Sequence, residues 1–76
     1  MTKQEQLVEY QIQDIIAYIV TDIQIEYDKA MDMFYNSQTF DKLTDIETGL
    51  YLESPAYVYG LFQDERNFGH LIQAEI

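Results

Sequence analysis

The sequence predicts an all-α fold, a small bundle of three to four short helices. Apolar residues recur at steps of three and four along most of the 76 residues, and a Ser-Pro pair and a few glycines mark the ends of the periodic segments. A chain of this length can build one hydrophobic core but not two, so residues 1–76 are expected to form a single helical domain. The apolar fraction of 47% is that of a folded chain rather than a disordered one.

The first helix is expected over residues 3–22. Its apolar residues follow the helical period, whereas Glu9, Gln13 and Asp14 occupy the other faces. The predicted buried stripe consists of Leu7, Val8, Ile12, Ile15, Ile16, Ile19 and Ile23. Because many of these residues are β-branched and only fair helix formers, burial of the stripe must hold the helix in place.

A second amphipathic helix is expected over residues 26–35, after a short extended connection. Its apolar side is formed by Tyr27, Ala30, Met31, Phe34 and Tyr35. This spacing of i, i+3, i+4, i+7 and i+8 assigns Tyr27 and Tyr35 to the inner side of the helix. Both tyrosines are therefore expected to have structural roles.

Ser37 can cap a third helix over residues 38–44, which would turn Phe40 and Leu43 inward. Because neither proline nor glycine occurs before Gly49, the alternative is one continuous helix with a kink near Ser37. Gly49 tolerates a positive φ, so a turn is expected over residues 47–49.

The fourth helix is expected to begin at Ser54-Pro55. Serine is a favoured N-cap residue, and proline suits the first helical position because its missing N–H is not needed there. The inner stripe of this helix consists of Val58, Leu61, Phe62 and Glu65. The helix should end near residue 67, with Gly69 as its stop.

The charge of the chain limits its partners. Fourteen acidic and four basic residues give a net charge of −10, which repels phosphate backbones and anionic lipid head groups. Neither nucleic acid nor a membrane is therefore an expected partner. The acids are spread along the chain, which is typical of a solvated outer face, although they could also form an acidic surface matched to a basic partner. No signal peptide or long apolar run is found, so the expected compartment is the cytoplasm.

The sequence offers little catalytic or metal-binding chemistry. Cysteine is absent, and His70 is the one histidine, so neither a zinc site nor a catalytic triad is expected. A calcium loop starting at Asp45 would require glycine where Leu50 stands and glutamate where Ala56 stands. We expect no catalytic residue, no cofactor and no metal.

Seven tyrosines and no tryptophan are the most distinctive feature of the composition. Tyrosine suits both the rim of a small core and the centre of an interface. Tyr57 and Tyr59 are about 200° apart on a helix, so at least one of them must point away from the core. Together with Tyr51, they are the predicted partner-binding residues.

The segment AMDMFYNSQTFDKLTDIETGLYLESPAYVYGLFQDE, residues 30–65, resembles a group of short cytoplasmic bacterial proteins of unknown function. The shared pattern is a FYNS...KL helix pair followed by a TGLY.ES..YVY turn and helix. The resemblance covers about half of the chain and implies no catalytic or binding residues. It favours a partner-binding role, such as that of an antitoxin.

These observations predict a small acidic helical protein-interaction module that forms a homodimer and binds a protein partner, one with a basic surface if the acidic face takes part. An antitoxin-like or regulatory role fits this description. The alternative is a ligand-binding or enzymatic helical domain that uses carboxylates and tyrosines in a pocket between helices. A DNA-binding helix-turn-helix is a third geometric option, but the charge contradicts it.

Overall fold

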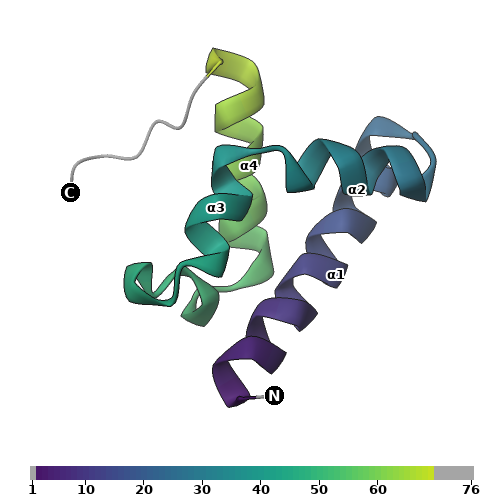
Figure 1. The fold of residues 1–76 in the computed structure, drawn as a ribbon. Helices are drawn as coiled ribbons and strands as arrows, with labels where there is room; N and C mark the ends of the chain where they lie inside the picture. The colour runs from purple at the N-terminus through teal and green to yellow at the C-terminus, as the bar shows by residue number, and fades with distance from the viewer. Residues whose placement is uncertain (1, 70–76) are drawn as a thin grey trace.

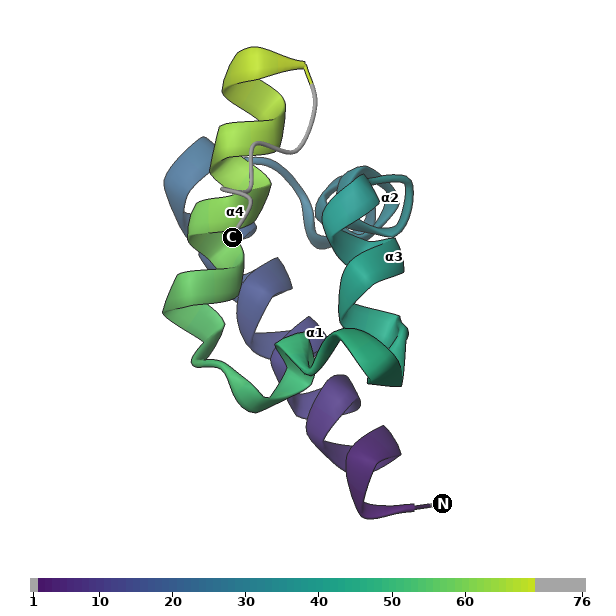
Figure 2. The same ribbon diagram turned by 90° about the vertical axis from the view of Figure 1, so that its left-hand side faces the viewer.

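The structure is a computed structural model that describes residues 2–69. Within this range the fold is all α, as predicted (Figure 1). The elements are α1 (Lys3–Ile23), α2 (Tyr27–Tyr35), α3 (Gln38–Thr44), the 3-10 turns η1 (Ile46–Thr48) and η2 (Leu50–Leu52), and α4 (Pro55–Phe68). Helix α4 packs against α1 and α3, and α2 lies crosswise to both α3 and α4 (Figures 1 and 2).

Helix α1 begins with a capping box. The Thr2 hydroxyl accepts a hydrogen bond from the Glu5 backbone N–H at 3.1 Å, and the Glu5 carboxylate accepts one from the Thr2 N–H at 3.0 Å. The helix runs one residue beyond the predicted end and is followed by Gln24 in the left-handed conformation, with φ of 60°. A non-glycine residue at this C-cap position gives no strong signal in the sequence.

Helices α2 and α3 are separate, so the alternative of one kinked helix is wrong. Ser37 has an extended backbone, and its hydroxyl accepts from the Phe40 N–H at 3.1 Å while donating to the Phe34 carbonyl at 2.5 Å. One side chain thus closes the end of α2 and caps the start of α3.

The start of α3 has a second cap from a distant part of the chain. The Glu65 carboxylate of α4 accepts from the backbone N–H groups of Gln38 and Thr39 at 2.8 and 2.9 Å, and from the Thr39 hydroxyl at 2.8 Å. Together with Ser37, Glu65 supplies acceptors for the first three N–H groups of α3, which no carbonyl within the helix can reach. This contact ties α4 to α3.

Helix α4 begins and ends where the sequence predicts. Ser54 is the N-cap, with its hydroxyl accepting from the Tyr57 N–H at 3.2 Å, and Pro55 is the first helical residue. Gly69, with φ of 81°, follows the last helical residue. The predicted turn residue Gly49 also has a positive φ, of 70°, but lies between two 3-10 turns that were not predicted.

The cap at Ser54 gives a first testable prediction. Replacing Ser54 with alanine should lower the free energy of unfolding by about 1 kcal/mol, because the Tyr57 N–H loses its acceptor. Chemical denaturation of both proteins measures the difference. Unchanged stability would mean that the hydroxyl does not act as a cap.

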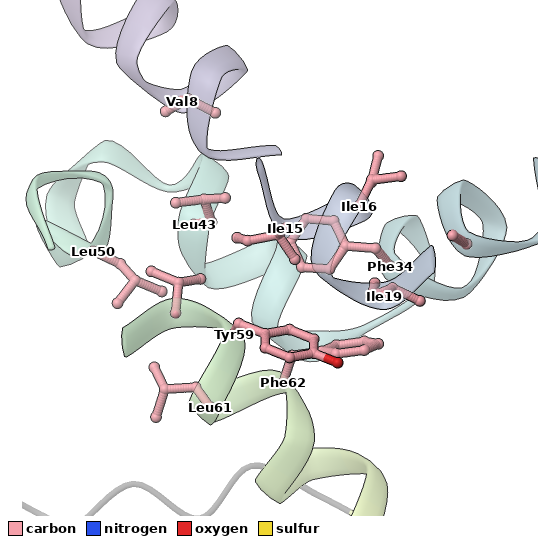
Figure 3. Packing of buried hydrophobic residues seen from close by; sticks show 12 residues of the cluster. Val8, Ile15, Ile16, Ile19, Phe34, Leu43, Leu50, Tyr59, Leu61 and Phe62 are labelled. Atoms are coloured by element: carbon pink, nitrogen blue, oxygen red, sulfur yellow. The ribbon is translucent and has the colours of Figure 1, made fainter. Parts of the chain in front are cut away.

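The core lies where the four helices converge (Figure 3). The Phe34 ring packs edge-on against Phe40 and Phe62, with centroids 5.6 Å away in each case. The fully or largely buried apolar residues are Val8, Ile15, Ile16, Ile19, Ala30, Phe34, Leu43, Leu50, Val58, Tyr59, Leu61 and Phe62. Most of the predicted inner positions of α1, α3 and α4 are among them.

The prediction that Tyr27 and Tyr35 face the core is wrong, since both are exposed. They are the first and last residues of α2, whereas its fully buried residues, Ala30 and Phe34, lie between them. Helical periodicity gives the side of the helix on which a residue lies, but not whether a neighbour covers that turn. Tyr35 still covers the edge of the core, with its ring 4.9 Å from that of Phe40.

Candidate functional site

A groove runs between the N-terminal half of α1 and residues 51–55, which lead from η2 into the first residue of α4 and are called the η2–α4 connection below. On α1 it is lined by Leu7, Tyr10, Gln11 and Asp14, and on the other side by Tyr51, Leu52, Glu53 and Pro55. The α1 residues share one side of the helix because they follow the i, i+3, i+4 and i+7 spacing. The groove has a volume of about 280 Å³.

Gln11 holds the two sides of the groove together. Its side-chain NH₂ group donates to the Tyr51 carbonyl at 3.1 Å and also to the Glu53 carbonyl. These bonds join α1 to residues 40 and 42 positions away in the sequence, where no regular secondary structure pairs the two backbones. Both hydrogen atoms of the amide are thereby used.

The oxygen of the same side chain has no such partner. Gln11 is only 5% exposed, and its Oε1 atom is buried without a hydrogen-bond donor among residues 2–69. The orientation of the amide is fixed, because turning it over would direct the oxygen at two carbonyl oxygens. An unpaired buried acceptor of this kind costs about 1–3 kcal/mol, so it is a rare feature in a folded chain.

The rest of the groove combines apolar surface with negative charge. Tyr10 and Leu52 are 62% and 69% exposed, and Asp14 and Glu53 are also exposed. Among residues 2–69, no lysine, arginine or histidine lines the groove to balance these two carboxylates. The groove therefore presents aromatic and aliphatic surface beside an unbalanced negative charge.

The structure separates the three tyrosines that the sequence predicted as partner-binding residues. Tyr51 lines the groove and is partly buried, whereas Tyr57 is exposed on α4 away from the groove. The expectation that Tyr57 and Tyr59 point in different directions is confirmed, because Tyr59 is only 8% exposed. Tyr59 therefore presents little surface to a partner, and Figure 3 shows it among the core side chains.

Tyr59 joins α4 to the C-terminal half of α1. Its hydroxyl donates to the Asp22 carboxylate at 2.9 Å, and its ring lies 5.3 Å from the Tyr18 ring. Burial, helped by the hydrogen bond to Asp22 and by the negative charge of Asp22, raises the pKa of Tyr59 from its ordinary value of 10.0 to about 12. The hydroxyl is therefore held protonated as a structural donor.

The raised pKa predicts a loss of stability in strong alkali. The protonated hydroxyl stabilises the fold fully below pH 10, and this contribution, about 2–3 kcal/mol, is lost as the pH rises towards the folded pKa of about 12. In Tyr59→Phe this part of the pH dependence should be absent. Denaturation of both proteins at neutral and alkaline pH measures it, and parallel alkaline losses would contradict the assignment.

A second variant tests the role of Asp22. In Asp22→Asn the pKa of Tyr59 should fall from about 12 towards 10.

A second hollow lies on another face of α1. It has a volume of about 460 Å³ and is lined by Glu5, Val8, Glu9, Ile12, Thr44 and Ile46. The single hydrogen of the Thr44 hydroxyl is shared between the carbonyls of Phe40 and Asp41. No tyrosine lines this hollow, so it lacks one of the two residue types that the alternative of a ligand-binding pocket requires.

Within the described part of the chain, no group of three or more histidine, cysteine, aspartate or glutamate residues is placed to hold a metal ion. His70 lies outside the described residues. Across residues 2–69, no helix has both the length and the apolar character that crossing a membrane requires.

The homodimer predicted from the sequence would pair through the fourth helix and bury the apolar residues left outside the core. These are one of Tyr57 and Tyr59, together with Tyr51, Phe68, Leu71, Ile72 and Ile76. Phe68 is exposed at the end of α4, whereas Leu71, Ile72 and Ile76 lie outside the described residues. Self-association therefore stays a prediction.

The chain matches no protein-family model, no curated protein and no solved structure. The resemblance of residues 30–65 to short bacterial proteins accordingly stays a prediction. The sequence did not predict the groove, but a signal for Gln11 was present. Gln11 stands three residues after Val8 and four before Ile15, so the period of the buried stripe includes this polar residue.

Proposed function

We propose that this protein is a small acidic interaction module that binds a basic segment of another protein in the groove between α1 and the η2–α4 connection. The observation that carries the proposal is the combination, in one groove, of exposed apolar surface, two carboxylates with no basic side chain among the described lining residues, and a buried acceptor that lacks a donor within residues 2–69. A cationic side chain with an apolar stem would complement all three.

The charge of the whole chain supports the same kind of partner. A net charge of −10 attracts a basic protein over a distance of roughly a Debye length, about 8 Å in physiological salt, and speeds its encounter. At the interface itself, the apolar side chains of Tyr10, Tyr51 and Leu52 would supply the contact area. Binding should therefore weaken with salt but not vanish.

An antitoxin-like role is one form that this function could take, since an acidic protein can neutralise a basic one by covering its surface. The resemblance of residues 30–65 to short bacterial proteins favours this form. A homodimer is compatible with it when the pairing uses the exposed residues of α4 beyond Pro55, because Pro55 itself lines the groove. Sedimentation equilibrium tests the dimer separately.

The experiment measures the affinity of a short fluorescent peptide of alternating basic and apolar residues by anisotropy. The double variant Asp14→Asn, Glu53→Gln removes both groove carboxylates, and the control Glu9→Gln, Asp28→Asn removes two exposed charges elsewhere. We expect a loss of about tenfold for the groove variant, against about twofold for the control. Equal losses would show that only net charge matters and would overturn the proposed site.

A further inference from the structure

We infer that the groove recognises the guanidinium group of an arginine side chain on the partner, with Gln11 Oε1 as a hydrogen-bond acceptor. This inference rests on the proposed function, which requires only a basic partner. It adds the identity of the partner side chain that the groove recognises. The two statements can fail separately.

The buried acceptor is the first step of the argument. Both N–H bonds of the Gln11 amide are engaged by the carbonyls of Tyr51 and Glu53, so the amide cannot turn to relieve its oxygen. Only a donor brought in from outside residues 2–69 can then pair with Oε1. A partner group that pairs with Oε1 must therefore carry an N–H or O–H bond.

The carboxylates of Asp14 and Glu53 indicate that the partner group that donates to Gln11 Oε1 is a cation. Both line the same groove as Gln11, and no basic side chain among the described lining residues neutralises them. A guanidinium has five N–H donors in a planar fork, so it can donate to the amide oxygen and to a carboxylate at once. A lysine ammonium is a compact and strongly hydrated charge, which cannot donate in the same planar fork.

The aromatic walls favour the same side chain. Tyr10 and Tyr51 line opposite sides of the groove, and a planar guanidinium stacks on the faces of aromatic rings. The volume of about 280 Å³ is below the range of about 300–1,000 Å³ usual for small-molecule sites. It therefore fits one or two side chains of a partner better than a complete small ligand.

The donor must also reach a buried atom. Tyr10 precedes Gln11 in α1 and is 62% exposed, so its side chain can change rotamer with little loss of packing. The backbone of the groove is held by the Gln11 bonds and need not move.

The test uses three peptides that differ at one central residue, which is arginine, lysine or the neutral arginine isostere citrulline. We expect the arginine peptide to bind at least about tenfold more tightly than the lysine peptide, and the citrulline peptide to bind most weakly. In Gln11→Met, which removes the acceptor but keeps the length of the side chain, the preference for arginine over lysine should fall to about twofold. Circular dichroism checks that this variant folds.

The wild-type protein gives a second readout that does not depend on the folding of a variant. The side-chain NH₂ signals of Gln11 in a nitrogen–proton correlation spectrum should shift with the arginine peptide and much less with the lysine peptide. Equal affinity for arginine and lysine, with unmoved Gln11 signals, would overturn arginine recognition and leave the basic partner in place. Failure of all the charged peptides to bind would overturn the proposed function together with this inference.

Discussion

Replacing Gln11 with glutamate should lower the free energy of unfolding by about 3–5 kcal/mol at neutral pH, which is enough to unfold many domains of this size. The new carboxylate would face the carbonyl oxygens of Tyr51 and Glu53, at a position that is only 5% exposed. An oxygen replaces a nitrogen that donated two hydrogen bonds, and the buried negative charge has no partner. Chemical denaturation of the variant and the wild type measures the loss.

The matched control is Gln13→Glu, which adds the same charge to an exposed position of the same helix. Its effect should stay within about 0.5 kcal/mol. Because the glutamate at position 11 is disfavoured more strongly when ionised than when protonated, its folded pKa should be raised, and the deficit should shrink, without vanishing, as the pH falls towards the ordinary glutamate pKa of about 4.3. Equal stability of the two variants would mean that Gln11 does not join α1 to the η2–α4 connection.

Replacing Glu65 with alanine should destabilise the protein by about 2–3 kcal/mol. The carboxylate accepts hydrogen bonds from two backbone N–H groups at the start of α3 and from the Thr39 hydroxyl, and bonds to a charged acceptor are stronger than neutral ones. All three donors would lose their partner at a contact that joins α4 to α3. Glu65→Gln, which keeps one acceptor oxygen, should lose less.

The control for Glu65 is Asn67→Ala, two residues further along the same helix at an exposed position. Because alanine favours the helix more than asparagine does, this change should be neutral or slightly stabilising. Denaturation curves of the three variants give the comparison. If Glu65→Ala were as stable as Asn67→Ala, the carboxylate would not act as a cap for α3.

The parts of the fold that the sequence predicted are those set by neighbouring residues. Ser37 and Ser54 each cap a helix through an N–H three residues away, and Gly69 ends α4 through its own backbone conformation. Such signals can be read locally. By contrast, Gln11 and Glu65 make their main contacts with residues 26 to 42 positions away, and no local pattern indicates those partners.

The candidate site was predictable only in part for the same reason. Tyr51 was selected as a partner-binding residue and does line the groove, but its neighbours there come from α1, which periodicity could not place beside it. The prediction for Tyr27 and Tyr35 failed for a different reason. Both lie on the side of α2 that periodicity assigned to them, but both are exposed there, because the described neighbouring helices do not cover these positions. A helical stripe therefore specifies a direction, whereas burial depends on how the helices cross.

The central claim is that a cationic partner docks in the groove rather than elsewhere on an acidic surface. Mapping the backbone amide shifts of the protein during titration with the arginine peptide tests this claim directly. The largest shifts should fall on residues 7–14 and 51–55, which include the groove lining. Shifts concentrated around Glu5, Glu9 and Ile46, or spread evenly over all the acidic residues, would contradict it.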